Sequence, residues 1–473
     1  MTATEEADPT ENAGGVSGRP RSTLWTPAHR FTTVGLVVVM TLMAFEYLGV
    51  ATALPTLVAN LHGGRLYAWP ITAFAAASAV GSALAGRWAD RRGPATPLLA
   101  SIALFCLGLV IAGTASMMAM LLLGRVVQGF GAGACTVAMY VLIAQVYPQS
   151  DRPAMSAVLA GAWVVPSLVG PAVAGLVTVA FGWRWVFLGL LPLLLVGTAF
   201  VVPVVRRLPP PDQNAAPATR PGLVLAAIGA AIGVATLTAG AQQLNLVSIP
   251  IVLVGGVIAV VSLRRLVPRG TFRAARGLPA VVASRGLLAG AYDAVEAYLP
   301  LVLTAVHGLS PSLAGLPLTI GALGWSGASA WQSRYPRLSR SRLLRLAFVL
   351  IAIGLVGIAL VAVRATPSWI ALPAWVFAGA GMGIGMPAIS VLLMAQSPPA
   401  DRGFNSSAIQ LAEVLASVVL VGLGGVLVNT FGSTSRPGGP LLVFDLLMAA
   451  VVVFGAILPA RRTALDERSE PQS

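Results

Sequence analysis

The sequence is poor in charge and contains no lysine. Of its 473 residues, 10% are charged and 57% are apolar, and the mean hydropathy is +0.85. Soluble proteins carry about 25% charged residues, so a chain of this length with so few charges cannot cover a water-exposed surface. The composition therefore argues against an ordinary soluble enzyme and indicates an all-α integral membrane protein.

Side chains that bind metals or act as nucleophiles are also scarce. The two cysteines, Cys106 and Cys135, both lie inside apolar runs, and His29, His62 and His307 lie far apart in connecting segments. Neither a disulfide framework nor a metal site is expected from this set. The sequence therefore predicts no enzyme, no catalytic residue, no metal and no cofactor.

All the positive charge comes from arginine. The formal net charge is +14, which on a soluble protein would suggest nucleic acid. In a membrane protein, basic residues in the cytoplasmic loops fix the orientation and meet anionic lipid. We therefore expect membrane lipid as a partner and no nucleic acid.

Long apolar runs make up most of the chain. A helix needs about 20 apolar residues to cross a bilayer. Fourteen runs qualify, at 31–54, 68–86, 95–114, 117–145, 154–180, 184–205, 222–240, 246–263, 278–303, 312–331, 344–363, 369–395, 406–429 and 440–459.

The arginines support this count. If the N-terminus is cytoplasmic, most arginines fall in cytoplasmic segments and few fall outside, as the positive-inside rule expects. Those outside are Arg65, Arg184, Arg364 and Arg436. An even number of spans places both termini in the cytoplasm, with a disordered tail at 1–30, no signal peptide, and a second tail at 460–473.

The chain resembles itself at an offset of 250 residues. One set of residues recurs after this interval: Gly129, Gly131, Gly133, Asp151, Arg152 and Ser156 match Gly379, Gly381, Gly383, Asp401, Arg402 and Ser406. The repeat predicts two six-helix halves at 31–205 and 278–459, with two inserted helices at 206–277. Two such halves describe the major facilitator architecture, in which one half rocks against the other.

Three motifs strengthen this resemblance. The loop after the second run resembles the major facilitator signature in Gly86, Asp90, Arg91, Arg92 and Gly93, whereas Pro94 departs from it. This resemblance implies a latch on the cytoplasmic side. A charged turn that only sets topology is the alternative. The fourth run, with Arg125, Gln128 and Gly129, resembles the family's fourth-helix motif. The fifth resembles a motif found mostly in exporters, in Gly161, Pro166, Gly170, Pro171 and Gly175; its alternative is generic loose packing.

The last part of the first run, from Phe45 to Pro55, is similar to the first-helix motif of the fourteen-helix drug:proton antiporter family, with Glu46 where that family usually has Asp. This resemblance implies a proton-coupled exporter. Glu46 and Arg125 both fall in the outer half of the first six-helix unit, so we expect them to pair, because an unpaired charge at that depth is expensive.

The ninth run carries the most charge. Asp293 and Glu296 share one helix face, and two carboxylates this close repel each other, which favours binding a proton near neutral pH. An ion pair with an arginine is the alternative. Glu413 is a further coupling candidate or a structural residue, Arg285 is expected to extend toward the cytoplasm, and Asp445 is expected to be hydrated near the outer end of its run.

Together these features predict alternating-access export of small amphipathic or cationic compounds across the cell membrane, coupled to protons, by a chain that works as a monomer. Export of a lipid or an endogenous metabolite remains open, and an uptake symporter is disfavoured by the fifth-run motif. The two inserted helices are expected at the periphery without a transport role.

Overall fold

A computed structural model describes residues 23–27, 29–148, 150–208, 222–241, 248–335, 338–398 and 401–457. Most of both predicted tails therefore lies outside the described residues, as does the side chain of Asp90. Within these ranges the secondary structure is helical, apart from one isolated bridge between Ser433 and Arg436.

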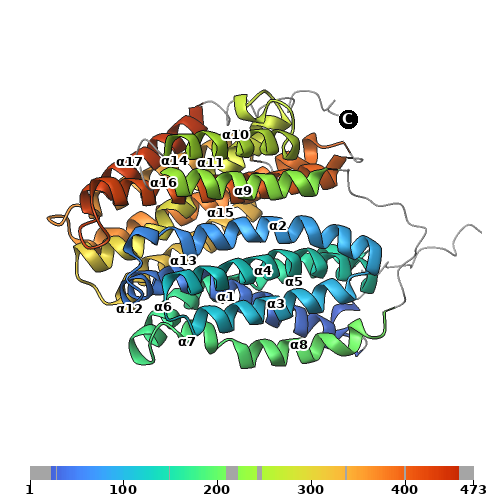
Figure 1. The fold of residues 1–473 in the computed structure, drawn as a ribbon. Helices are drawn as coiled ribbons and strands as arrows, with labels where there is room; N and C mark the ends of the chain where they lie inside the picture. The colour runs from blue at the N-terminus through green and yellow to red at the C-terminus, as the bar shows by residue number, and fades with distance from the viewer. Residues whose placement is uncertain are drawn as a thin grey trace, which may run out of the picture.

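The first group of helices packs around α1 and α4. It comprises α1 (Arg30–Asn60), α2 (Trp69–Arg92), α3 (Ala95–Gly113), α4 (Met118–Val146), α5 (Arg152–Gly161), α6 (Val164–Ala180), α7 (Trp185–Leu188) and α8 (Leu191–Val205). α4 packs on α2 and α3, whereas α1 packs on α6 and α8. Figure 1 shows this group in blue to green.

The last group of helices repeats this arrangement and is drawn in yellow to red in Figure 1. It comprises α11 (Leu278–Leu301), α12 (Pro311–Ala314), α13 (Leu316–Arg334), α14 (Arg340–Val361), α15 (Ala371–Gln396), α16 (Arg402–Phe431) and α17 (Gly438–Ile457). α15 packs on α13 and α14, and α11 packs on α16 and α17. Short helical turns complete the described structure: η1 (Thr23–Trp25), η2 (Gly64–Leu66), η3 (Thr271–Arg273), η4 (Val302–Val306) and η5 (Ser368–Ile370).

The repeat seen in the sequence is also a repeat of contacts. The hydroxyl of Ser82 donates to the Gly133 carbonyl at 3.1 Å, and that of Ser329 donates to the Gly383 carbonyl at 2.8 Å. At both glycines a Cβ would overlap a backbone carbonyl of the neighbouring helix, α2 or α13 respectively. Only glycine therefore permits this close approach of helices.

Between the two groups lie α9 (Leu223–Ala241) and α10 (Ser248–Leu266), which pack on each other. α9 also lies against α2 and α16, where Ala230 and Val234 share an apolar cluster with Val418 and contact Ala75. In Figure 1, α9 is drawn between α10 and α2.

Eleven of the described helical segments are long and apolar enough to cross a membrane. Val164–Ala180 and Leu225–Ala241 are apolar but shorter, and α13, interrupted by Gly, Ser and Trp, is not among the eleven. The count of fourteen spans and the cytoplasmic placement of both termini stay predictions.

Three predicted runs are each divided into two helices. The fifth run breaks between α5 and α6, the sixth between α7 and α8, and the tenth between α12 and α13. A proline lies in the first turn of each second helix, at Pro166, Pro192 and Pro317. Proline fits a helix start, where its missing N–H is not needed, so each break occurs where a helix can begin again.

Candidate functional site

A small cavity of about 30 Å³ lies between the two groups of helices. Its lining comes from α1, α2 and α4 on one side and from α11 and α16 on the other: Tyr47, Leu48, Ala51, Ile71, Ala75, Arg125, Asp293, Glu296, Ala297, Ser417, Val418 and Val421. The walls are mostly apolar, with a few polar groups, as is usual for small-molecule sites. The cavity therefore brings together Arg125, Asp293 and Glu296, three residues singled out from the sequence.

On the first wall, Arg125 forms an ion pair with Glu46, and both side chains are fully buried. Its guanidinium also donates to Gln128 Oε1 and to the Pro70 carbonyl, each at 2.9 Å, and lies 4.3 Å from the centre of the Phe74 ring. The predicted pairing of Glu46 with Arg125 is thus present. These partners offset the cost of burying the guanidinium.

Glu46 is less completely satisfied than Arg125. Among the described residues no group donates to its Oε2, which is buried. A buried oxygen without a donor is costly while the carboxylate is charged, and a proton on the carboxyl would lower that cost.

On the opposite wall, Asp293 and Glu296 lie one turn apart on α11. Ser417 of α16 donates to Asp293 Oδ2 at 2.6 Å. Within the described part of the chain, neither carboxylate forms an ion pair, and Glu296 has no hydrogen bond. The alternative of an ion pair between this carboxylate pair and an arginine therefore finds no support among these residues.

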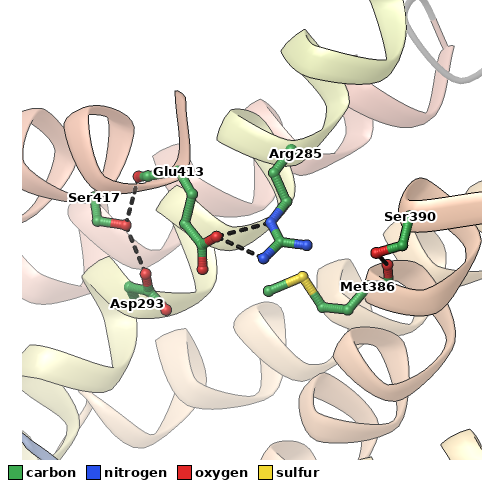
Figure 2. A network of polar contacts seen from close by, with 6 residues as sticks. All are labelled: Arg285, Asp293, Met386, Ser390, Glu413 and Ser417. Carbon is green, nitrogen blue, oxygen red and sulfur yellow. Dashed lines mark hydrogen bonds and ion pairs between the residues drawn. The ribbon is translucent and has the colours of Figure 1, made fainter. Parts of the chain in front are cut away.

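Arg285, two turns earlier on α11, pairs with Glu413 of α16. The guanidinium nitrogens lie 2.6 and 2.8 Å from Glu413 Oε2, and both side chains are partly exposed. Figure 2 shows this pair beside Asp293 and Ser417, with Met386 and Ser390 of α15 on the other side of Arg285. Arg285 is thus held by a carboxylate, and Glu413 joins α16 to α11.

Asp445 corrects one expectation. It is 1% exposed and one of its carboxyl oxygens has no partner in the described structure, so it is not hydrated. α17 packs against α11, α14 and α16, and these neighbours cover the face that carries Asp445. The position of Asp445 near a helix end did not indicate that neighbouring helices bury it.

The predicted latch is only partly visible. Arg91 and Arg92 are exposed at the end of α2, and Gly93 follows with a φ of 71°, a left-handed conformation that favours glycine. Gly86 has open space around it. Because the side chain of Asp90 lies outside the described structure, the latch stays a prediction.

The predicted export motif lies on α5 and α6. A Cβ at Gly175 would come within 2.6 Å of the Cα of Ser312 in α12, and one at Gly315 would come within 2.9 Å of the Pro171 carbonyl. The motif therefore lets α6 of the first group touch α12 of the last group. Gly170 faces α1, Pro166 is buried, and Gly161 has open surroundings at the end of α5.

Further contacts join the two groups at the same end of the molecule, where α1 ends and α2 begins. The hydroxyl of Tyr67 donates to the Ala297 carbonyl at 3.2 Å, and its ring stacks on Tyr298 with centroids 5.3 Å apart. Asn429 Nδ2 donates to the Arg65 carbonyl at 2.7 Å. This end is the predicted external side.

Tyr67 and Ser417 were not expected from the sequence. Each contacts a site residue or its neighbour from a different helix, and neither belongs to a charged motif. Serine and tyrosine are common in membrane helices and give no signal of their own, so only the packing reveals their place.

Comparisons with known proteins agree with this architecture. The family model described as Major Facilitator Superfamily matches residues 34–421. A probable multidrug-efflux transporter of Mycobacterium tuberculosis is 29% identical over 425 residues, which cover 85% of this chain and 88% of that relative. An uncharacterized transporter of Schizosaccharomyces pombe is 32% identical over 194 residues, covering 41% of this chain and 33% of that protein.

Solved structures share the fold. A bacterial homolog of the human lysosomal transporter Spinster, in an inward-facing and unoccupied conformation, has a TM-score of 0.66 at 14% identity and covers 93% of this chain and 97% of its own. A POT family transporter in complex with a thioalcohol conjugated peptide has a TM-score of 0.67 at 16% identity, with coverage of 92% and 97%. Since the family match spans most of the sequence, this chain belongs to the Major Facilitator Superfamily of multi-pass membrane transporters.

Proposed function

We propose that the protein exports small amphipathic or cationic compounds across the cell membrane in exchange for protons, by alternating access and as a monomer. One observation carries the proposal: Asp293 and Glu296 line the central cavity without a cationic partner among the described residues. The other charges beside the cavity form pairs, Glu46 with Arg125 and Arg285 with Glu413.

This distribution of charge leaves the cavity wall negative when both carboxylates are ionised. A cationic compound would be attracted to it, and its apolar part would contact the Leu, Ile, Val and Ala side chains of the lining once the cavity widens during the cycle. A proton bound at either carboxylate would remove that attraction. Proton binding and cation binding at one site therefore compete, which is the requirement for exchange.

The direction of transport rests on two supports. The close approach of α6 to α12 uses the glycines of a motif that resembles one found mostly in exporters. The printed name of the Mycobacterium tuberculosis relative refers to multidrug efflux. Contacts at the predicted external end, such as Tyr67 to Ala297, would correspond to a state that is open toward the cytoplasm.

The test is uptake of a panel of lipophilic cations, neutral amphiphiles and lipids into everted membrane vesicles with an imposed pH gradient. Asp293→Asn and Glu296→Gln should each reduce gradient-driven transport of the cations by at least about tenfold, the equivalent of one lost charge interaction. Glu296→Asp keeps the carboxylate and is the matched control, with smaller loss expected.

Two outcomes would contradict the proposal. Full gradient-driven activity in both neutral variants would place coupling elsewhere. Transport of lipids but not of cations by the wild-type protein would favour the lipid exporter that the sequence left open.

A further inference from the structure

The hydroxyl of Ser417 lies between two oxygen acceptors. Its Oγ is 2.6 Å from Asp293 Oδ2 on α11 and 2.9 Å from the Glu413 carbonyl one turn earlier on α16. Ser417 is 8% exposed, so water has little access to it. A serine hydroxyl carries one proton and can donate to only one of these oxygens at a time.

The charge of Asp293 decides which oxygen receives the proton. An ionised carboxylate only accepts, so Ser417 then donates to Asp293 and the Glu413 carbonyl loses that donor. A protonated Asp293 can itself donate to Ser417 Oγ, and the Ser417 proton then turns to the Glu413 carbonyl. No proton is transferred by Ser417 in this exchange; the proton on Asp293 comes from the cavity.

The second bond acts on the shape of α16. A serine that donates to the carbonyl four residues earlier tends to bend its helix. The residue whose carbonyl is involved, Glu413, also holds Arg285 through its side chain, as Figure 2 shows. A change at Ser417 therefore falls one turn from the point at which Glu413 joins α16 to α11.

We propose that Ser417 is a positioning residue that transmits the protonation state of Asp293 to the packing of α16 against α11. The inference rests on the proposed proton coupling and adds the residue through which the bound proton changes the structure. α16 also lies against α2 of the first group, so a bend in α16 changes the contact between the two groups.

Several charged and titratable groups surround Asp293, and the test must separate them from Ser417. They are Tyr292, Glu296 and Arg285 on α11, Glu413 on α16, Tyr47 on α1 and Arg125 on α4. Asp445 is the acidic residue of α17, which also packs on α11. The lining residues of α2 near the cavity, Ile71 and Ala75, do not titrate. Only Ser417 among the described residues is hydrogen-bonded to Asp293.

Ser417→Ala is the test, because it removes the hydroxyl without changing any charge. The ionised carboxylate of Asp293 loses its donor. The midpoint of the pH dependence of efflux should therefore move to higher pH by about one unit, because the free energy of a hydrogen bond to a charged group corresponds to about one pH unit. Ser417→Thr keeps a hydroxyl at the same position and should restore the wild-type profile.

Ser390→Ala is the matched control. Ser390 donates to the Met386 carbonyl of its own helix at 3.0 Å, as Ser417 does to Glu413, but no carboxylate accepts from it in the described structure. Its removal should leave the profile unchanged. If Ser417→Ala does not accumulate in the membrane, Ser417→Cys, a weak donor of similar size, should give the same shift.

A second measurement does not depend on transport. In purified protein, the infrared band of the protonated carboxyl that disappears in Asp293→Asn should titrate at higher pH in Ser417→Ala than in the wild type. An unchanged titration in Ser417→Ala or Ser417→Cys would overturn the inference, whatever the efflux assay shows. If the wild-type protein shows no proton-driven efflux but the carboxyl still titrates at higher pH in Ser417→Ala, only the proposed function would be overturned.

Discussion

Glu46 and Arg125 form a buried ion pair, but the two side chains differ in how many further partners they have. Arg125 has Gln128, the Pro70 carbonyl and the Phe74 ring besides Glu46, whereas Glu46 has a buried oxygen without a donor in the described structure. Neutralising Glu46 therefore leaves the guanidinium three further partners. Removing Arg125 would leave Glu46 with none of the contacts described for it.

We expect Glu46→Gln to accumulate in the membrane and bind substrate but to lose gradient-driven transport by about tenfold or more, the effect of one lost charge interaction, because glutamine cannot release a proton. Reconstitution in liposomes with an imposed pH gradient measures this. Glu46→Asp keeps the charge and serves as control. Normal gradient-driven transport by Glu46→Gln would show that the pair is a static bridge.

At the scale of single helices, much could be predicted from the sequence and some could not. The apolar runs located the helices because a bilayer demands about 20 such residues, and the Asp-Arg and glycine repeat indicated two related halves. The breaks before Pro166, Pro192 and Pro317 were missed, because an apolar run continues through a break when the backbone is satisfied by neighbouring helices.

Part of the candidate site could also be predicted from the sequence. Charges inside apolar runs are rare enough to attract notice, which identified Asp293 and Glu296. Ser417, which donates to Asp293, and Tyr67, which donates to the Ala297 carbonyl, were not identified, because their importance depends on packing between helices distant in sequence. The burial of Asp445 was missed because a position near a helix end does not show what covers it.

The equivalent glycines of α4 and α15 give a prediction at this scale. Gly133→Ala and Gly383→Ala should lower thermal stability by similar amounts, roughly 1–3 kcal/mol each, because the added methyl meets the carbonyls of Ser78 and Trp325. Thermal unfolding in detergent checks this. Gly327→Ala is the control, since its surroundings on α13 are open, and equal loss there would disprove the packing explanation.

At the scale of the molecule, the two groups of helices are joined at one end by backbone contacts between α6 and α12 and by the bond from Tyr67 to Ala297. Ala297 directly follows Glu296 in the chain. Separation of the groups at this end must therefore break a hydrogen bond to the backbone next to one of the two carboxylates that lack an ion pair in the described structure. This links opening at the predicted external side to the cavity.

Tyr67→Phe tests this link, because it keeps the stacked ring and removes only the hydroxyl. We expect it to favour separation of the groups by about fivefold, since one neutral hydrogen bond is worth about 1 kcal/mol. A cysteine at Ala51, in protein with Cys106 and Cys135 replaced, should then react faster with an impermeant reagent added outside. Tyr140→Phe, which removes the hydroxyl of an exposed tyrosine in the last part of α4, is the control. Unchanged labelling in Tyr67→Phe would contradict the expectation.

The position of α9 has a consequence for how the bilayer meets the transporter. The two groups of helices meet along two seams, one between α2 and α16 and the other between α6 and α13. α9 packs against both helices of the first seam, so lipid tails there face the inserted pair. A compound dissolved in the membrane that approaches the second seam meets α6 and α13 directly. The bilayer therefore meets the two seams unequally, facing the inserted pair at the first and the seam helices themselves at the second.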